Sequence, residues 1–361
     1  MDSPCQICGI KQKAGCQGRK KMSLNSINVK RRTVLAGLGI GLGATLLPGK
    51  LWAQGKQRVA LLMVGSISDG GWNQLAFEGL ADLKAKGFDT AYVENVTQAR
   101  IPEVVRGYAD DGFDLIIGHG YNFGSTIAEF APEYPDQKFF VTAIQAGVKT
   151  VDNVQFINLA YVGAAYAAGA LAALISDNRK AVGFVGGGDN PTQQAMNRAF
   201  ISGAQNTVEG LRGFGVVTGD YNNAAKGKEA ALTMIGNGAD VIWHAADVTG
   251  LGAIQGAAGA GAKVIGCYAN QTALAPDRMA TSFMLNLRWV VNELGRSLAA
   301  GSFAGGTEWR PSIKEIWVQV YGTAEQMTNF NPALVNADAK AKFEAILDDL
   351  ESGKINLDGF E

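Results

Sequence analysis

Histidine and cysteine are scarce in this 361-residue chain, which holds two histidines and four cysteines. Three of the cysteines lie within the first 16 residues, so Cys267 stands alone in the remainder, where no internal disulfide can form. The C-x-x-C spacing of Cys5 and Cys8 has no second ligand pair, and no H-E-x-x-H motif or matching carboxylate spacing accompanies the histidines. We therefore expect no metal, no cofactor and a fold stabilised by packing.

Basic residues are also few outside the N-terminus. Residues 1–53 carry nine Lys or Arg and one acid, whereas residues 54–361 carry 23 basic and 32 acidic residues. A nucleic-acid partner needs clustered Lys and Arg to neutralise phosphates. The acidic body therefore argues against nucleic-acid binding and leaves small neutral ligands open.

The basic N-terminal segment precedes a short apolar run. Lys30-Arg31-Arg32 is followed by the uncharged residues 33–47 and later by the small residue Ala53. This pattern is typical of a secretory signal, and the Arg pair favours the twin-arginine route. The run is shorter than the roughly 20 apolar residues that span a bilayer. We expect cleavage near Ala53 and a periplasmic mature protein, with a retained N-terminal anchor as the alternative. The start could be Met1 or Met22.

From residue 57 onward, short β-rich apolar runs alternate with helical stretches, which is typical of an α/β fold with parallel sheets. The elements predicted in the first half are strands 58–64, 89–93, 114–117 and 138–142 and helices 72–86, 101–110 and 125–130. The runs 59–64, 87–88, 115–119 and 137–140 recur at 181–185, 213–214, 240–244 and 262–265. A repeating unit of this size is a whole domain. The sequence therefore predicts two Rossmann-like lobes of one design, each a parallel sheet with helices on both faces.

We divide the chain into an N-terminal segment (1–53), a first lobe (54–157 plus 285–308) and a second lobe (158–284 plus 309–361). The last elements predicted are a helix at 287–300, a linker at 301–306, a strand-like stretch at 313–321 and a tail helix at 337–352. These are too few for a third domain, so hinge crossovers between the lobes are expected near 154–158, 279–284 and 309–313. Ligands in open α/β sheets bind outside the carboxyl ends of the strands, and the cleft between the lobes is therefore the predicted site.

The loop Asp69-Gly70-Gly71-Trp72-Asn73-Gln74, followed by Phe77-Glu78-Gly79, resembles the opening loop of the basic membrane protein family of substrate-binding proteins, which are related to purine nucleoside receptors. Further matches lie at 115–118, 165–173 and 182–187. The resemblance covers most of residues 57–325. It implies a type I periplasmic binding protein, without enzymatic activity, that acts as a monomer and delivers a purine-like molecule to an ABC permease in the inner membrane.

The resemblance also carries over site residues. Trp72 matches the aromatic residue that stacks on the base, with helix-start packing as its alternative. Asp69 and Asn73 lie in the loop that contacts the base. Residues 266–271 match a Gly-x-Asp-x-x-Gln run whose Asp holds ribose hydroxyls, but Tyr268 stands at the Asp position here. A phenol cannot accept two hydroxyls as a carboxylate does, so we expect a free base to bind in preference to its nucleoside.

The two histidines, His119 and His244, end equivalent strands and should both point at the cleft. A neutral imidazole offers one donor and one acceptor, which suits a nucleobase edge, although a structural role at a strand end is equally open.

Other polar residues that follow strands are also candidate ligand contacts. Asp189 and Asn190 follow Gly186-Gly187-Gly188, which lets backbone approach a ligand, but Asn190 could equally cap a helix. No Lys-Ser or Lys-Thr follows, so this run is not a phosphate-binding loop. The remaining polar candidates are Tyr121, Asn122, Asp247 and Asn270, and the second stacking ring is either Tyr268 or Trp243.

Two other functions stay open on the sequence alone. One is a ligand sensor for a membrane receptor kinase, which sequence cannot separate from an uptake protein. The other is a hydrolase or isomerase that uses the two histidines and an Asp, although no activated nucleophile motif supports it.

Overall fold

The computed structural model describes residues 55–143, 148 and 151–360. The predicted signal segment and its cleavage site near Ala53 lie outside these described residues. Within them, no helix has both the length and the apolar character needed to cross a membrane.

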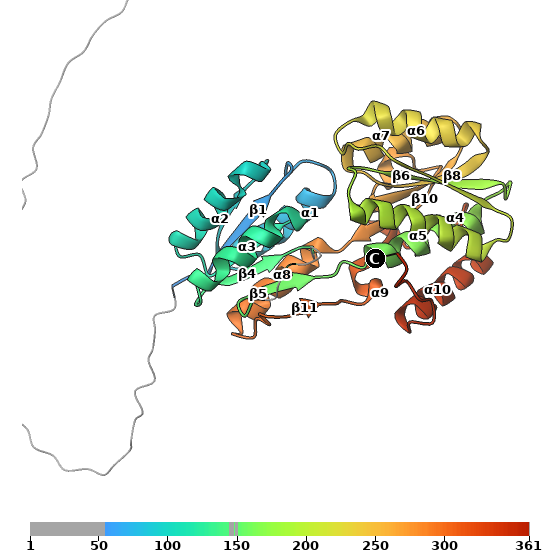
Figure 1. The fold of residues 1–361 in the computed structure, drawn as a ribbon. Helices are drawn as coiled ribbons and strands as arrows, with labels where there is room; N and C mark the ends of the chain where they lie inside the picture. The colour runs from blue at the N-terminus through green and yellow to red at the C-terminus, as the bar shows by residue number, and fades with distance from the viewer. Residues whose placement is uncertain (1–54, 144–147, 149–150, 361) are drawn as a thin grey trace, which may run out of the picture. The chain divides into compact units, whose positions relative to one another are not determined.

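The first sheet has six strands in the order β11-β5-β4-β3-β1-β2, and all neighbours pair in parallel (Figure 1). Its strands are β1 (Arg58–Met63), β2 (Asp89–Val93), β3 (Leu115–His119), β4 (Lys138–Val141), β5 (Val154–Ile157) and β11 (Glu308–Trp309). Successive side chains of β1 alternate between the two faces. Leu61 packs with α1 (Trp72–Ala85) and α8 (Leu287–Ala299), whereas Leu62 packs with α2 (Ile101–Asp110) and α3 (Gly124–Phe130).

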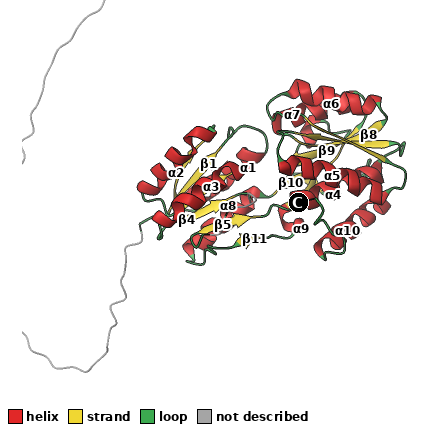
Figure 2. Cartoon of the chain, in the orientation of Figure 1, coloured by secondary structure: helices red, strands yellow, loops and turns green. Residues whose placement is uncertain are grey.

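The second sheet has seven strands in the order β13-β12-β10-β9-β8-β6-β7. They are β6 (Ala181–Gly186), β7 (Arg212–Val217), β8 (Ala239–Ala245), β9 (Lys263–Tyr268), β10 (Met279–Leu285), β12 (Trp317–Thr323) and β13 (Gln326–Thr328), of which β12 pairs antiparallel with both β10 and β13. Helices α4 (Tyr161–Ile175) and α5 (Pro191–Thr207) cover one face, and α6 (Ala224–Gly236) and α7 (Asp247–Gly259) cover the other (Figure 2). The tail helix α10 (Ala337–Glu351) packs against α4. Single 3-10 turns are η1 (Gln98–Arg100), η2 (Tyr121–Phe123), η3 (Ala131–Glu133) and η4 (Thr272–Leu274).

The internal repeat predicted from the sequence is present in the topology. The order β2-β1-β3-β4-β5 of the first lobe is matched strand for strand by β7-β6-β8-β9-β10 of the second. The fold is therefore the predicted α/β arrangement of two Rossmann-like lobes, with helices on both faces of each sheet.

Helix α4 differs from the other helices because almost all of its residues are buried, including every one from Val162 to Ala173. Small residues let α5 approach closely: a Cβ atom added at Gly169 would lie 2.0 Å from the Phe200 carbonyl oxygen, and one at Gly203 would lie 2.0 Å from that of Tyr166. The two helices therefore touch backbone to backbone at these glycines.

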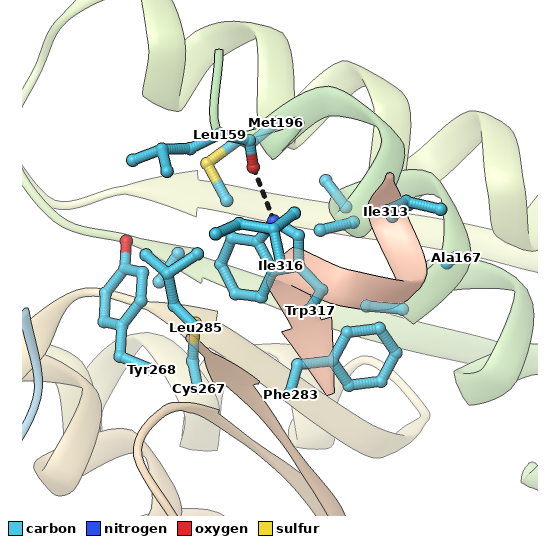
Figure 3. Packing of buried hydrophobic residues seen from close by; sticks show 14 of the residues in the cluster. Leu159, Ala167, Met196, Cys267, Tyr268, Phe283, Leu285, Ile313, Ile316 and Trp317 are labelled. Carbon is cyan, nitrogen blue, oxygen red and sulfur yellow. Dashed lines mark hydrogen bonds between the residues drawn. The ribbon is translucent and has the colours of Figure 1, made fainter. Parts of the chain in front are cut away.

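The chain passes between the sheets three times, after β5, after β10 and after β11, and hydrogen bonds tie the three crossing segments together. The indole Nε1 of Trp317 donates to the Leu159 carbonyl at 2.6 Å within a buried cluster (Figure 3). The backbone N–H of Asn286 donates to Ile316 at 2.9 Å, and that of Asn158 donates to Trp309 at 2.9 Å. We retain the division of the lobes at 157/158, 284/285 and 308/309 as a proposal.

The prediction of a strand over 313–321 is wrong at its start. The segment begins with a helical turn, α9 (Ile313–Ile316), and only then continues as β12. Ser312 and Glu315 form a capping box. The Ser312 side chain accepts a backbone N–H of the helical turn, the Glu315 side chain accepts the backbone N–H of Ser312, and the two bonds stabilise a helical start.

Candidate functional site

A cavity of about 510 Å³ lies at the carboxyl ends of the strands of both sheets. Its lining residues on the first sheet's side are Val64, Gly65, Ser66, Ser68, Asp69, Trp72, Asn73, Asn95, Gly120, Tyr121, Asn122 and Ala143, and those on the second sheet's side are Tyr161, Asn190, Thr192, Gln193, Tyr221, Asn222, Asp247, Val248 and Tyr268. Its volume falls in the range of small-molecule sites. The location is the one expected for a ligand in paired open α/β sheets.

Trp72 lines the cavity and rests on His119. The two rings stack with centroids 4.2 Å apart and an angle of 19° between their planes. His119 Nε2 donates to the Trp72 carbonyl oxygen at 3.1 Å, and burial lowers the pKa of His119 to about 4, so the imidazole is neutral. One face of the indole is therefore covered by a fixed ring, and the same indole lines the cavity.

The expectation that both histidines point at the cleft is wrong. His119 is fully buried behind Trp72 and supports it. His244 is buried against α7, where a Cβ atom at Gly250 would lie 1.8 Å from its Nδ1. Its Nε2 donates to Gln271 Oε1 at 2.9 Å, which also accepts the Cys267 N–H. Burial lowers the pKa of His244 to about 4. Both rings thus belong to the layer behind the cavity wall.

Three aromatic rings meet on the wall. The centroids of Tyr161 and Tyr268 each lie 6.1 Å from that of Trp72. Trp243 is excluded as the second ring, because it is fully buried and stacks on Phe200 with centroids 5.8 Å apart. Sequence reasoning kept Tyr268 as a candidate but missed Tyr161. The available signal was its position, since Tyr161 closely follows a predicted strand that ends in the hinge.

Asp69 lines the cavity, yet its carboxylate is committed to the start of α1. Oδ1 accepts the N–H groups of Gly71 and Gln74 at 2.9 and 3.1 Å. Oδ2 accepts the backbone and side-chain N–H groups of Asn73 at 2.8 and 2.7 Å. Asp69 therefore positions the loop that carries Trp72. Because the Asn73 amide nitrogen faces Asp69, the buried Asn73 Oδ1 is left without a partner among the described residues.

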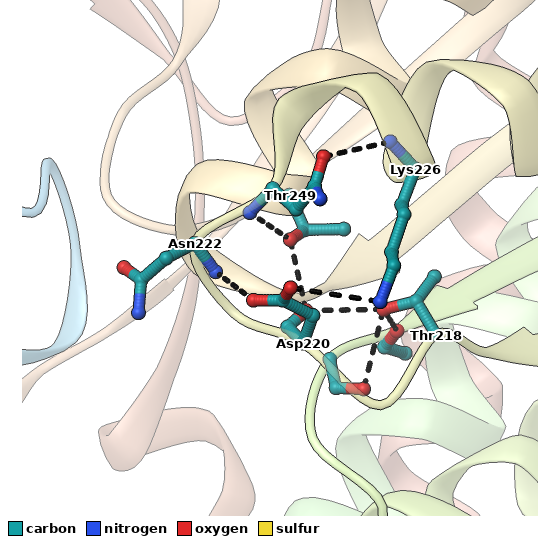
Figure 4. A network of polar contacts seen from close by, with 8 residues as sticks. Thr218, Asp220, Asn222, Lys226 and Thr249 are labelled. Carbon is teal, nitrogen blue, oxygen red and sulfur yellow. Dashed lines mark hydrogen bonds and ion pairs between the residues drawn. The ribbon is translucent and has the colours of Figure 1, made fainter.

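A polar network positions the loop that presents Tyr221 and Asn222 (Figure 4). Thr249 Oγ1 donates to the Asp220 carbonyl at 2.8 Å, and Thr218 Oγ1 donates to the same oxygen at 3.0 Å. The Thr249 N–H in turn donates to the Tyr221 carbonyl at 3.0 Å. The loop is therefore held from both flanking elements, and its two cavity side chains are set in place before any ligand binds.

The glycine run before α5 makes room for a side chain of the protein itself. Cβ atoms at Gly187 and Gly188 would lie 2.2 and 2.5 Å from the Tyr221 ring, so the expected close approach of this backbone to a ligand is wrong. Asn190 lines the cavity and caps α5, because its Oδ1 accepts the Gln193 N–H at 3.0 Å while its Nδ2 donates to the Tyr221 hydroxyl at 3.0 Å. Burial raises the pKa of Tyr221 to about 12.

Two further sequence candidates do not line the cavity. Asp189 turns away from it and accepts from the Gln194 amide at 2.8 Å. Asn270 is exposed, donates to the Gly322 carbonyl of β12 at 2.9 Å and accepts the Thr272 N–H at 3.1 Å. Short polar side chains in loops readily bond to nearby backbone, which explains the second contact of Asn270.

Tyr121 and Asn122 do line the cavity, as predicted from their place after β3. The Tyr121 side chain lies at the mouth of the cavity and is 44% exposed. Asn122 is tied by its Nδ2 to Gln98 Oε1 at 3.1 Å.

Asp247, the first residue of α7, is a lining residue with an unsatisfied carboxyl oxygen. Its Oδ1 is covered from solvent and has no partner among the described residues. Burial raises the pKa of the Asp247 carboxyl to about 7, and the nearby negative charge of Asp69 adds to the shift. It thus differs sharply from Asp69, whose carboxylate accepts four hydrogen bonds.

Backbone strain is concentrated around the cavity. Of the five non-glycine residues with positive φ in the described chain, Asn95, Asp247 and Tyr268 line it and Ala160 directly precedes Tyr161. The φ of +70° at Tyr268 is unusual for a bulky residue. Strain of this kind persists where surrounding structure enforces it, commonly at ligand sites.

The charges on the wall limit the chemistry of the site. Among the residues that the structure describes, Asp69 and Asp247 are its ionisable carboxyl groups, and the lining residues include no Lys, Arg or His. In the part of the chain that is described, no group of three or more His, Cys, Asp or Glu residues could hold a metal ion. The wall suits a neutral, flat, polar-edged molecule better than an anion.

Comparison with known proteins agrees with this geometry. The ABC transporter nucleoside-binding protein BmpA of Lactococcus lactis subsp. cremoris is 25% identical over 314 residues, covering 81% of this chain and 86% of the relative. A purine-binding protein of Brucella abortus is 26% identical over 318 residues, covering 86% and 85%. A solved ABC transporter solute-binding protein from Aeropyrum pernix has the same fold, with 20% identity and a TM-score of 0.71 over 82% of this chain and 92% of the other.

A family description matches residues 56–355, which include every element from β1 to α10 and the whole cavity wall. Members of this family are solute-binding proteins. The chain therefore belongs to the Bmp family of PnrA-like ABC transporter substrate-binding proteins.

Proposed function

We propose that this protein binds a purine-like heterocycle in the cavity and delivers it to an ABC permease. The observation that carries the proposal is the Trp72–His119 pair, in which an indole of the cavity wall is held by a stacked ring. Stacking on such a ring contributes on the order of 1–3 kcal/mol for a base. Relatives named for nucleoside and purine binding support the same ligand class.

The wall favours a free base over larger derivatives. Tyr268 stands where a ribose-binding Asp is expected from the family resemblance, and it contributes a ring to the wall. A phosphate would face Asp69 and Asp247, and no described residue of the wall is a cationic partner for it, so a nucleotide is disfavoured.

The mechanism we propose is closure. A ligand that touches loops of both lobes makes more contacts in the closed form and so shifts the equilibrium toward it. We further propose that the protein acts as a monomer in the periplasm after export by the twin-arginine route, and that the permease recognises the closed form.

A thermal-shift screen tests the ligand class. We expect adenine, guanine, hypoxanthine or xanthine to raise the Tm, because a ligand that binds only the folded state stabilises it. The matching nucleoside should raise the Tm less, and the nucleotide should not raise it. A Tm that responds only to ribose-bearing compounds would refute the preference for the base. A Tm that responds to none of these compounds would refute the ligand class itself.

A further inference from the structure

Asp247 is the one carboxyl on the wall whose hydrogen-bonding capacity is unused among the described residues. Its Oδ1 is covered, and a buried polar atom without a partner is unfavourable because its desolvation is not compensated. The residue also holds a left-handed backbone conformation with φ of +45°. A group kept in this state at the wall of a cavity is placed to contact what enters it. The inference that follows rests on the proposed function.

The groups that face Asp247 decide its protonation. They are Asp69 before α1, Tyr161 on α4, Tyr221 before α6, and Cys267 and Tyr268 on β9. Burial raises the pKa of Tyr161, Cys267 and Tyr268 well above their ordinary values, and the pKa of Tyr221 to about 12, so these groups are neutral at pH 7. Among the described residues, the charge that faces Asp247 is that of Asp69, and it is negative.

Two forms of the carboxyl would recognise different ligand edges. A carboxylate offers acceptors only and suits an edge with two donors. A carboxylic acid offers an O–H donor beside a carbonyl acceptor, and suits an edge where a ring nitrogen acceptor adjoins an amino group, or where a ring N–H adjoins a carbonyl oxygen. The described surroundings of Asp247 disfavour the charged form, because they combine burial with the like charge of Asp69.

We propose that Asp247 reads the ligand as a neutral carboxylic acid, donating its O–H to an acceptor on the heterocycle and accepting an N–H from the adjacent position. The ligand class is then a purine or related base with neighbouring donor and acceptor on one edge, as in adenine. The pairing transfers no proton, so Asp247 leaves the complex as it entered it.

The proposal makes binding depend on pH with a defined sign. Burial and Asp69 raise the pKa of Asp247 to about 7, so the acid form predominates below pH 7 and is lost above it. The affinity should be constant between pH 5.5 and 6.5. Above pH 7 it should fall about tenfold per pH unit, because each binding event must then restore a proton.

Titration calorimetry with adenine from pH 5.5 to 8.5 tests this on three proteins. The unsubstituted protein should show the fall in affinity above pH 7. Asp247→Asn should bind with little pH dependence, since an amide presents the same donor and acceptor pair as the neutral acid. Asp247→Leu should lose more than tenfold in affinity at pH 6. Asp189→Asn, on a neighbouring loop with its side chain directed away from the cavity, is the matched control and should behave as the unsubstituted protein.

The contrary results are distinct. Affinity that rises with pH, or an Asp247→Asn variant as weak as Asp247→Leu, would show that a carboxylate binds a two-donor edge or a cation, and would overturn the proposal. Equal adenine affinity in all the proteins at every pH would overturn the role of Asp247 while leaving purine binding intact. Binding of choline in place of every purine would overturn the proposed function as well, since a cation held by aromatic rings and a carboxylate would then be the ligand.

Discussion

Trp72 and Trp243 are both indoles at the carboxyl edge of a sheet, but their surroundings give them opposite roles. Trp72 opens a helix after a glycine-rich loop and has one face covered by His119. Trp243 lies within β8, and alternation along that strand sends its ring into the core between Phe184 and Phe200. Trp243 lies inside its strand and is held in the core, whereas Trp72 lies beyond the end of β1 and reaches the cavity.

The stacking role of Trp72 predicts the effect of removing its ring. Trp72→Ala should lower purine affinity by about 10- to 100-fold, which corresponds to the stacking energy of a base, whereas Trp72→Phe should retain most of it. Trp289→Ala removes an indole packed against Trp309 and is the control, expected to lower the Tm without changing the Kd. Calorimetry on the three variants checks this, and unchanged affinity in Trp72→Ala would move the stacking role to Tyr161 or Tyr268.

At this scale, position after a strand could be predicted and side-chain direction could not. Tyr121, Asn122, Asn190 and Asp247 were found because polar residues after parallel strands share one edge of a sheet. The histidines were misplaced because the neighbours that cover a strand-end ring come from distant segments, as Trp72 covers His119.

Helix α4 shows what a fully buried element requires. It has no polar face, so its sequence lacks the periodicity that marks a surface helix. What replaces periodicity is size, since Gly169 and Gly203 meet backbone of the opposing helix. For this reason the sequence showed the run 165–173 as a family motif but did not predict the helix α4, which begins at Tyr161.

Close contact at Gly169 makes a simple prediction about stability. Gly169→Ala should destabilise the protein by about 1–3 kcal/mol, because the added methyl group collides with the Phe200 carbonyl. Gly107→Ala, at an exposed position of α2 with no atom near the new methyl group, should instead stabilise by up to about 1 kcal/mol through helix propensity. Urea unfolding measures both, and a stabilising Gly169→Ala would contradict the packing described.

Most strand and helix bounds could be predicted from apolar runs and the turn-forming residues between them. The predicted strand 89–93 and helix 101–110 coincide with β2 and α2. The miss at α9 has a local cause. Its two isoleucines and the aromatic residue that follows them favour a strand, while Ser312 and Glu315 cap a helical turn, and the cap prevails.

At the scale of the whole molecule, buried ionisable groups make the stability of the fold depend on pH in opposite directions. The buried neutral His119 and His244 have pKa values lowered to about 4 from 6.5, so the stability tied to them is complete above pH 6.5 and declines as the pH falls toward 4. Asp247, with a pKa raised to about 7 from 3.8, acts in the opposite direction. The stability tied to it is complete below pH 3.8, declines as the pH rises toward 7 and is lost above that pH.

Comparing Asp247→Asn with the unsubstituted protein isolates the carboxyl, since the histidines are common to both. At pH 7.5 the variant should be more stable, by at most about 4 kcal/mol, because the unsubstituted protein must hold a carboxylate in an unfavourable place. The difference should shrink as the pH approaches 4. Urea unfolding across this range checks it, and a variant that is less stable at pH 7.5 would mean that Asp247 has a stabilising partner.

The global plan was the most predictable part of the protein. Runs that recur about 125 residues apart predicted two like lobes, and the rule for open α/β sheets predicted where their ligand lies. Which atoms of the wall stay unsatisfied depends on contacts among loops from both lobes, and no local pattern encodes these.

The three crossing segments, tied by the Trp317–Leu159, Asn286–Ile316 and Asn158–Trp309 hydrogen bonds, have a mechanical consequence. Three crossing segments that are hydrogen-bonded to one another allow the lobes to bend about one axis and resist twisting about the others. If the lobes move as proposed, Asp247 and Trp72 would return to the same relative position at each closure, so ligand selectivity would depend partly on the crossing segments as well as on the cavity wall.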